Sequence, residues 1–349
     1  MTEFKIGIIG AGMYGRNYLE TFRSLRSSSR NRAVITWVAS ASEASVKAAL
    51  EEYNIPHGTR DYREMLKDPD LDAVVITSPP DTHVAMAVDS LRAGKHVLVE
   101  KPMAVNRGEV QTLLAEVKKH PGQVVLEASC RHTRLQPKFT FIKNLIGNGR
   151  LGEVYHIHHN HLYPMTFIEY NPKGGWAMKK ASAGGGPFLD WGVYDLSFHL
   201  GLLDDRPELK SLRKFQRRDL RDLSSLAPGT DIEQHGAAWM EFTDGLTYYY
   251  ERGAGVFCDV PNETRIHGTR GSLRFAFCSW DSPVVDLYTS DAQNQPVHET
   301  LTVDMSAHPA NDNIPFVGHF LDCLEGKAEP MMTPERAAKH LEILFRILD

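Results

Sequence analysis

The sequence has few cysteines, no long hydrophobic run and no strong excess of charge. Its 349 residues include four widely separated cysteines, which argues against a disulfide framework and a cysteine zinc site. No run of about 18 apolar residues occurs, and the early run IGIIG is too short for the core of a secretory signal. A formal net charge of −5 gives no attraction to nucleic acid. We therefore expect a reduced, cytoplasmic protein whose partners are neither membranes nor nucleic acids.

Strand-like and helix-like segments alternate over the first third of the chain. Such alternation is typical of parallel strands joined by helical crossovers. The strand-like segments are 34–40, 73–78, 96–100 and 124–128, and the helical ones are 43–53, 61–68, 82–94 and 107–120. We therefore predict an α/β fold that begins with a doubly wound (Rossmann) parallel sheet over residues 1–128.

The segment GAGMYG carries three glycines spaced as GxGxxG between a strand and a helix. Gly10 permits a tight turn, Gly12 lets a pyrophosphate approach the backbone, and Gly15 lets the helix pack closely on the strand. The helix N-terminus, with Met13 and Tyr14, then faces the phosphate charge. The motif predicts a dinucleotide cofactor.

Ser40 and Ala41 follow the second strand, where dinucleotide folds often place an acid that binds the ribose 2′-hydroxyl. No carboxylate is there to repel a 2′-phosphate, and Ser40 could donate a hydrogen bond to one. The arginine of a strong phosphate clamp is missing at Ala41. We predict NADP as the preferred cofactor and NAD as the alternative.

The segment VEKPMAV ends a predicted strand with Glu100, Lys101 and Pro102. Ligands bind outside the carboxyl ends of the strands in open α/β sheets, so Lys101 is expected beside the nicotinamide. An ammonium there could hold a substrate hydroxyl and stabilise the alkoxide as hydride leaves. The alternative is a surface lysine that pairs with Glu100.

The segment GGGPFLDWGVYDLSFHL, residues 184–200, places Asp190 and Tyr194 four apart in an apolar run. On one helix, this spacing brings both side chains to the same side. A buried acid is either paired structurally or used, and both interpretations apply here. In the functional one, Tyr194 exchanges a proton with a substrate hydroxyl, while Asp190 binds a second hydroxyl and keeps Lys101 charged.

Six motifs occur in an order that resembles one family, the glucose-fructose oxidoreductase, inositol dehydrogenase and MocA-like oxidoreductases. The matching segments are GAGMYG (10–15), SPPDTH (78–83), AGKHVLVEKP (93–102), GGGPFLDWGVY (184–194), IHGTRGSLRF (266–275) and FVGHFLDCLEGKAEP (316–330). The resemblance implies that a Rossmann domain precedes an α+β domain whose large, open, mostly antiparallel sheet often forms an oligomer interface. It also implies a homodimer or homotetramer.

The resemblance implies a catalytic set of Lys101, Asp190 and Tyr194. Many family members have histidine where this chain has Tyr194, and tyrosine there argues against an inositol dehydrogenase. The expected cofactor-binding residues are Gly10, Gly12, Met13, Tyr14, Gly15, Ser40, Ser78, Pro79, His83, Glu100 and Lys101.

The pattern changes after residue 128, and we predict that 129–349 forms the α+β domain. Hairpin signals surround the turns at 243–245 and 269–271, and a last helix at 334–348 is expected to act as a terminal brace.

The predicted strand EVYHIHHNHLY has His156 and His158 on one face and His159 and His161 on the other. Paired histidines invite a metal site, but no cysteine and few carboxylates lie near them. We favour a polar strand and expect no metal.

A pocket with hydroxyl-reading side chains and an aromatic face suits a sugar or polyol. The candidate substrate contacts are Arg131, His132, Tyr163, Trp176 and Asp190. We predict an NAD(P)-dependent oxidoreductase that moves hydride between nicotinamide and a hydroxyl or carbonyl carbon of such a substrate. The rival hypotheses are a catalytically silent sugar-sensing regulator and a nicotinamide-dependent glycosidase.

Overall fold

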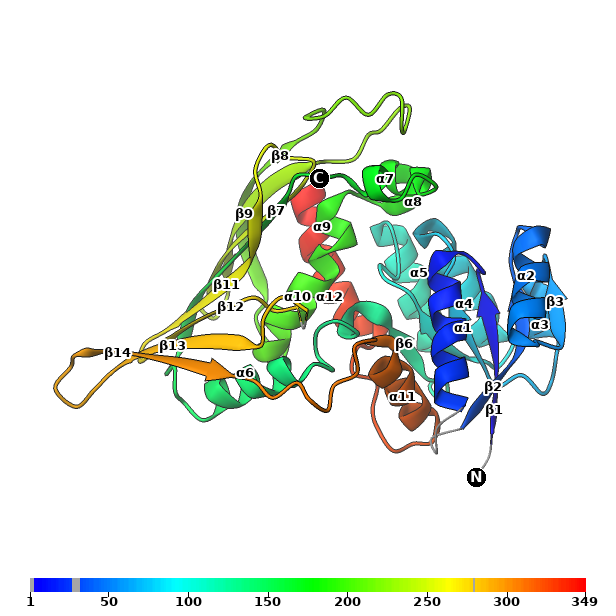
Figure 1. Cartoon of the computed structure of the whole chain (residues 1–349), viewed down its shortest axis with the longest axis horizontal. Coiled ribbons are helices and arrows are strands. Elements are labelled where there is room, and N and C mark those ends of the chain that lie inside the picture. The colour runs from blue at the N-terminus through cyan, green and yellow to red at the C-terminus, as the bar shows by residue number, and fades with distance from the viewer. Residues whose placement is uncertain (1–2, 27–31, 279) are drawn as a thin grey trace. The chain divides into compact units, whose positions relative to one another are not determined.

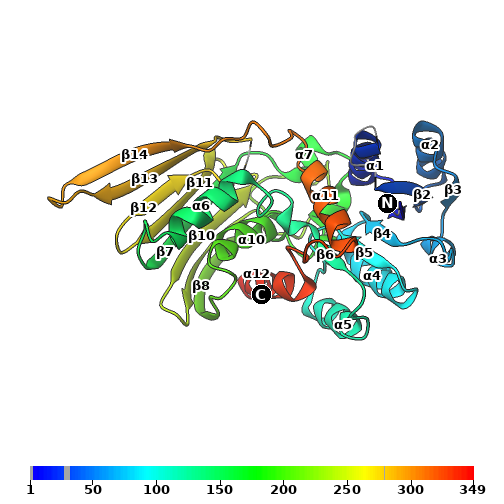
Figure 2. The same ribbon diagram turned by 90° about the horizontal axis from the view of Figure 1, so that it is seen from below.

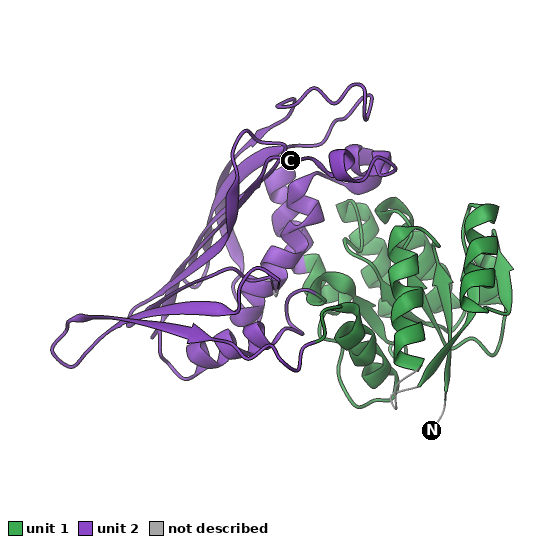
Figure 3. Ribbon diagram, in the orientation of Figure 1, with its two compact units in different colours: residues 1–131, 309–338 green, residues 132–308, 339–349 purple. Residues whose placement is uncertain are grey.

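The chain forms two compact units in a computed structural model, coloured separately in Figure 3. The units are Met1–Arg131 with Pro309–Ala338, and His132–His308 with Lys339–Asp349. The structure describes residues 3–26, 32–278 and 280–349. Within those ranges, no helix combines the length and the apolar character needed to cross a membrane.

The first unit is built on a six-stranded parallel sheet with the order β3-β2-β1-β4-β5-β6. Its strands are β1 (Phe4–Ile9), β2 (Ala33–Ala39), β3 (His57–Thr59), β4 (Ala73–Ile76), β5 (His96–Val99) and β6 (Val125–Glu127). All residues of the central strand β4 are buried, as expected where helices cover both faces of a parallel sheet. This confirms the predicted doubly wound sheet, whose topological switch point lies between β1 and β4.

Helices α1 and α2 lie on one face of this sheet, and α4 and α5 lie on the other (Figure 2). The helices of the unit are α1 (Met13–Arg26), α2 (Glu43–Tyr53), α3 (Tyr62–Leu66), η1 (Pro80–Thr82), α4 (His83–Arg92), α5 (Arg107–Val117), η2 (Ala128–Cys130) and α11 (Asn313–Leu324). Side-chain caps fix where several of them begin: the Asn106 side chain, for example, accepts from the amide of Glu109 at 2.9 Å.

Residues 309–338 return to the first unit after the second sheet is complete. Helix α11 packs on α1, and Arg32 donates to Asp322 at 2.7 Å. Beside the edge strand β6, the amide of Glu127 donates to the carbonyl of Met332 at 3.0 Å. The sequence prediction placed this whole segment in the second domain, because nothing local in it signals the long-range contacts that hold it to the first unit.

The second unit contains an eight-stranded sheet with the order β14-β13-β12-β11-β7-β10-β9-β8. Its strands are β7 (Val154–Tyr163), β8 (Leu209–Arg217), β9 (His235–Phe242), β10 (Thr247–Ala254), β11 (Val260–Gly268), β12 (Ser272–Phe275), β13 (Val284–Ser290) and β14 (Pro296–Thr302). Strands β7 and β10 are parallel, and every other pair is antiparallel. The two predicted hairpins, β9–β10 and β11–β12, and the mostly antiparallel sheet are confirmed.

One face of this sheet is covered by helices and the other is open (Figure 1). The helices of the unit are α6 (Pro137–Gly147), α7 (Phe167–Tyr170), η3 (Gly175–Met178), α8 (Lys180–Ala183), α9 (Pro187–Asp190), α10 (Gly192–Leu202) and α12 (Pro334–Leu348), which begins in the first unit. Tyr248 and Tyr250 on the covered face are fully buried, whereas Trp239 and Phe215 on the open face are 42% and 47% exposed. The core of the unit therefore lies between the sheet and α10.

Candidate active site

The three glycines of the loop between β1 and α1 each meet a different steric demand. Gly10 has a φ of +104°, a conformation that favours glycine. A Cβ on Gly15 would lie 1.8 Å from the carbonyl oxygen of Gly10, so α1 could not pack there with a larger residue. A Cβ on Gly12 would meet nothing within 4 Å. The backbone at Gly12 therefore borders open space at the N-terminus of a 14-residue helix, which fits the pyrophosphate of a dinucleotide.

Two other predicted cofactor contacts belong to the first turn of α1. Met13 is 58% exposed at the start of the helix. The ring of Tyr14 is instead engaged from one side by the guanidinium of Arg131, whose carbon lies 5.0 Å from the ring centroid. Met13 is thus the more accessible of the two.

The loop after β4 is fixed to the loop after β5 by a buried histidine. One ring nitrogen of His83 lies 2.8 Å from the carbonyl of Ser78, and the other lies 2.8 Å from the carbonyl of Pro102. Burial lowers the pKa of His83, which is 1% exposed. The predicted cofactor contact His83 is therefore placed as a link between the Ser78–Pro79 turn and the Lys101–Pro102 turn.

Glu100 forms a buried ion pair with Arg131, and Tyr18 donates to the same carboxylate at 2.7 Å. Burial raises the pKa of Glu100, but the charge and hydrogen bonds of Arg131 outweigh it and hold the pKa below its usual range. The second carboxylate oxygen accepts from the backbone amide of Lys101 at 3.1 Å. Arg131 is fully buried. This corrects the expectation that Arg131 contacts substrate: its partners place it under the Lys101 turn.

A second buried acid lies at the same sheet edge. Glu127 ends β6, is paired in register with Val99, and is 1% exposed. Its side chain accepts from the amide of Ser129 at 2.7 Å. Burial raises the pKa of Glu127 to about 7, although hydrogen bonds from Ser129 and, to a smaller extent, the Lys101 ammonium oppose the rise.

A cation missed by the sequence prediction lies beside the turn after β2. The guanidinium of Arg60 donates to the carbonyl of Ala41 at 3.2 Å. The amide of Ser40 donates to the carbonyl of Thr59 at 3.1 Å, which brings the residue before Arg60 alongside. Arg60 is exposed. The parallel pairing of β2 with β3 thus supplies the arginine that the sequence lacks at Ala41.

In the second unit, a buried carboxylate caps the segment that begins with three glycines. Glu233 accepts from the amide of Gly186 at 2.8 Å and from the amide of Phe188 at 3.1 Å. A Cβ on Gly186 would lie 2.1 Å from the carbonyl oxygen of Glu233, and one on Gly185 would lie 2.8 Å from Leu348. The glycines are needed because the backbone presses against its neighbours here.

Asp190 and Tyr194 do not lie on one continuous helix. Asp190 ends the four-residue helix α9, Trp191 forms the corner, and Tyr194 lies in the first turn of α10. The amide of Tyr194 donates to the carbonyl of Trp191 at 2.8 Å. Trp191 therefore interrupts the helix between them, although its backbone stays in the right-handed helical region. Tyr194 is 1% exposed and Asp190 is half-buried.

Aromatic rings surround the phenol of Tyr194. The ring centroids of His132 and Trp191 lie 5.0 and 5.5 Å from that of Tyr194. Trp280 lies 5.1 Å from His132 and 6.2 Å from Trp191 and is 57% exposed. We call Trp191, Tyr194, His132 and Trp280 the aromatic cluster. The sequence prediction named His132 but missed Trp280, which lies in a loop between β12 and β13 that carries no motif.

Two other predicted substrate contacts lie elsewhere in the second unit. Tyr163 ends β7 with its ring 6.5 Å from His161, and Trp176 in η3 lies 6.1 Å from Phe167. Both rings are about two-fifths exposed, at 41% and 40%. Neither belongs to the aromatic cluster, so a substrate role for them stays a prediction.

The strand histidines have different surroundings on the two faces of β7. His159 is fully buried, with Nδ1 3.0 Å from the hydroxyl of Thr264. On the open face, His156 stacks on Trp239 with centroids 5.4 Å apart. Among the described residues, no group of three or more His, Cys, Asp or Glu side chains is arranged to hold a metal ion.

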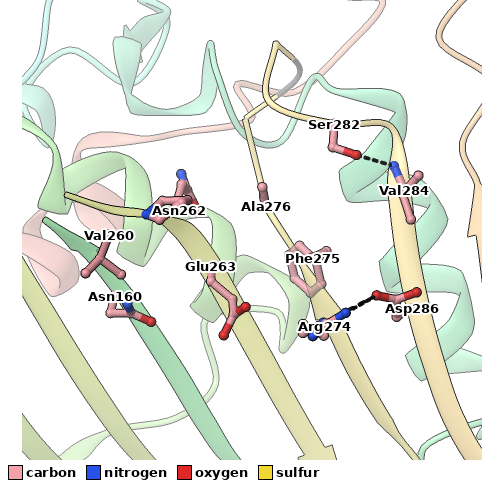
Figure 4. A pocket seen from close by; sticks show the side chains of 11 residues that line it. Asn160, Val260, Asn262, Glu263, Arg274, Phe275, Ala276, Ser282, Val284 and Asp286 are labelled. Carbon is pink, nitrogen blue, oxygen red and sulfur yellow. Dashed lines mark hydrogen bonds and ion pairs between the residues drawn. The ribbon is translucent and has the colours of Figure 1, made fainter. Parts of the chain in front are cut away.

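A polar pocket of about 430 Å³ occurs in the second unit (Figure 4). It opens between β11 and β13, where β12 ends, and Arg274 donates to Asp286 inside it at 2.9 Å. It is lined by Asn160, Val260, Pro261, Asn262, Glu263, Arg274, Phe275, Ala276, Ser282, Val284 and Asp286. None of the predicted site residues lines this pocket.

Two family models match the chain in the order that the resemblance predicted. Residues 4–128 match the model described as oxidoreductase family, NAD-binding Rossmann fold, and residues 139–274 match the GFO/IDH/MocA C-terminal domain. The chain belongs to the GFO/IDH/MocA family. The predicted membership and fold class are therefore confirmed.

Relatives of this chain are named for different reactions. An inositol 2-dehydrogenase of Salmonella typhimurium is 31% identical over 169 residues, which cover 48% of each chain. A 1,5-anhydro-D-fructose reductase of Ensifer adhaerens is 25% identical over 94% of this chain and 90% of its own. The chain spans about half the length of the inositol 2-dehydrogenases that it matches.

Solved structures share the fold along the whole chain. A levoglucosan dehydrogenase in complex with NADH superposes with a TM-score of 0.83 at 18% identity, covering 99% of this chain and 96% of its own. At this identity, the similarity describes the fold of this GFO/IDH/MocA family member and not its substrate.

Proposed function

We propose that this protein is an NAD(P)-dependent oxidoreductase that interconverts a hydroxyl-bearing and a carbonyl carbon of a sugar or polyol. The observation that carries the proposal is the open space at Gly12, at the N-terminus of α1, within the segment that matches the NAD-binding family model. Relatives named for inositol and for 1,5-anhydro-D-fructose support a polyhydroxylated substrate. The bound nicotinamide would supply the hydride acceptor or donor.

The proposed catalytic residues are Lys101, Asp190 and Tyr194. Lys101 Nζ holds the substrate oxygen and stabilises negative charge on it, while the Tyr194 hydroxyl takes the proton in oxidation and returns it in reduction. The Asp190 carboxylate binds a second hydroxyl and keeps Lys101 charged. Their convergence on one substrate carbon is a prediction, because Lys101 belongs to the first unit and the other two belong to the second.

The aromatic cluster would recognise the apolar side of the substrate. A sugar presents C–H groups on one face and hydroxyls at its edge, so an exposed indole next to a phenol and an imidazole suits it. Trp280 is the most exposed ring of the cluster. We propose it as an aromatic substrate contact in addition to Trp176.

We propose NADP as the preferred cofactor. The exposed Arg60 guanidinium is anchored on the Ala41 carbonyl beside Ser40, at the end of β2 where the 2′ position of the ribose is read. A fixed guanidinium and a hydroxyl are suited to bind a phosphate. NAD would gain nothing from Arg60.

The open face of the eight-stranded sheet is proposed to join subunits into a homodimer or homotetramer. Tyr155, Phe215 and Trp239 are 50%, 47% and 42% exposed there. Large aromatic side chains are enriched where a surface becomes buried by a partner. A cytoplasmic location stays a prediction.

The test is a panel of aldoses, ketoses, inositols and keto-sugars with both cofactors in each redox state, followed by nicotinamide absorbance. We expect cofactor turnover with at least one substrate, and a loss of about 10² to 10⁴-fold in kcat for Tyr194→Phe with cofactor binding unchanged. Lys101→Ala should reduce kcat more than cofactor affinity. A sensing regulator would bind sugar without turnover, and a glycosidase would release an aglycone without net reduced cofactor.

A further inference from the structure

A buried ion pair that the proposed chemistry does not use lies directly behind the corner between α9 and α10. Arg252 on β10 donates to both carboxylate oxygens of Asp195, at 2.6 and 2.8 Å. The two side chains are 4% and 0% exposed, and Tyr250 adds a hydrogen bond to the same carboxylate at 2.7 Å. Burial lowers the pKa of Arg252, but the charge of Asp195 outweighs it and holds the pKa above its usual range. Arg252 therefore stays charged.

The Arg252–Asp195 pair contacts the corner at Trp191 in two ways. Asp195 directly follows Tyr194, and its amide donates to the carbonyl of Trp191 at 3.1 Å. The guanidinium carbon of Arg252 also lies over the Trp191 ring, 5.2 Å from its centroid. One arginine thus contacts the corner residue itself and the first turn of α10, which carries the phenol.

The corner at Trp191 packs closely against β10 and α12. Helix α9 is only four residues long, and Trp191 separates it from α10. The backbone at Gly192 lies close against its neighbours, since a Cβ there would be 2.9 Å from the Tyr250 hydroxyl and 2.7 Å from Leu344. A small displacement of β10 relative to α10 would therefore move the corner.

Charged pairs are a costly way to fill a core, because well-packed apolar side chains of similar volume often stabilise a fold as well or better. Their advantage is geometric, since the planar guanidinium fixes a carboxylate in one orientation. His159 does not share this work: its Nε2 lies 3.5 Å from Asp195 Oδ1, and burial keeps its pKa well below the usual value, so it is neutral.

We infer that Arg252 is a positioning residue that acts through Asp195 and Trp191 to set the orientation of Asp190 and Tyr194 in the active site. This inference rests on the proposed function. It assigns to the buried pair a role in kcat in addition to its role in folding.

The chain offers a matched control in the same unit. Arg134 and Asp205 form a second buried, two-pronged pair, with distances of 2.7 and 2.6 Å and exposures of 5% and 7%. Arg134 also donates to the carbonyl of Ser197, at the middle of α10. Arg134 therefore contacts the same helix as Arg252, but at a point distant from Trp191.

The first experiment compares Arg252→Lys with Arg134→Lys. Lysine keeps the charge but loses the fork geometry, and a displacement of about 1 Å at a catalytic group costs on the order of 10²-fold in rate. We expect Arg252→Lys to lower kcat about 10²-fold without changing cofactor affinity, and Arg134→Lys to lower thermal stability without lowering kcat. Equal kcat values for wild type and Arg252→Lys would overturn the inference.

A double variant separates positioning from stability. Asp195→Leu with Arg252→Met replaces the pair by apolar groups and should restore thermal stability toward that of wild type. If the pair only stabilises the fold, kcat recovers with stability. We expect kcat to stay about 10²-fold low, because no guanidinium then orients the corner.

Hydrogen exchange provides a readout that needs no turnover. Peptides covering 187–195 should exchange faster in Asp195→Asn than in wild type, while those covering 197–205 should respond only in the Arg134 variant. Unchanged exchange at 187–195 would refute the inference even in an inactive protein. An inactive wild type with faster exchange in Asp195→Asn would instead refute the proposed function alone.

Discussion

Glu127 makes the stability of the first unit depend on pH in a predictable direction. Burial raises its pKa from 4.5 to about 7 in the folded protein. Each pKa unit corresponds to about 1.4 kcal/mol, so the difference is worth about 3 kcal/mol of unfolding free energy. Because the folded state holds the proton more tightly, this stability is fully present below pH 4.5 and is lost as the pH rises to 7.

The substitution Glu127→Gln tests this, because glutamine keeps the shape of the glutamate side chain and does not titrate. The measurement is the free energy of unfolding from urea denaturation, for wild type and variant, between pH 4 and pH 8. We expect the wild-type value minus the variant value to fall by about 3 kcal/mol between pH 4 and pH 7 and to level off above that.

Glu116→Gln is the control, because ion pairs with Arg92 and Lys119 hold the pKa of Glu116 at about 2. The contribution of Glu116 to the free energy of unfolding is present above pH 4.5 and is lost as the pH falls toward 2. The wild-type value minus the Glu116→Gln value should therefore stay flat from pH 5 to pH 8. A Glu127 difference that is also flat, or that rises with pH, would contradict a pKa raised by burial.

Three substitutions test the binding roles. Gly12→Val should fold normally, because a Cβ there meets no neighbour, yet weaken cofactor binding at least about tenfold; unchanged affinity by fluorescence titration would move the pyrophosphate elsewhere. Arg60→Ala should raise the Kd of NADP about tenfold and leave that of NAD unaltered, whereas parallel changes in both would remove its phosphate role. Trp280→Ala should raise KM for the sugar about tenfold with kcat nearly retained, since it removes uniform binding; a normal KM would place the ring outside the substrate site.

The parts of this protein that sequence predicts well are those set by near neighbours along the chain. The GxGxxG segment and the alternating strands and helices depend on local sterics and periodicity, so the first sheet follows directly from them. The two hairpins of the second sheet are likewise signalled by their own turns. The local sequence of each of these elements therefore predicts it without knowledge of the rest of the fold.

The parts that sequence does not predict depend on distant partners. Arg131 was expected to meet substrate, but its partner Glu100 is 31 residues away and buried. The start of α9 is capped by Glu233, which lies 45 residues downstream of Phe188. Arg60 reaches Ala41 only because β2 pairs with β3. None of these contacts leaves a periodic signal in the sequence.

The parallel pairing of β7 with β10 has a consequence for how the chain is made. His156 lies opposite Thr247, 91 residues later, and the other neighbour of β7 is β11, which comes later still. On the ribosome, β7 therefore waits with both edges unpaired until most of the second unit has emerged. Non-local closure of this kind slows maturation and exposes the nascent chain to aggregation. The centre of the eight-stranded sheet is thus left without partners on the nascent chain until β10 and β11 have been made.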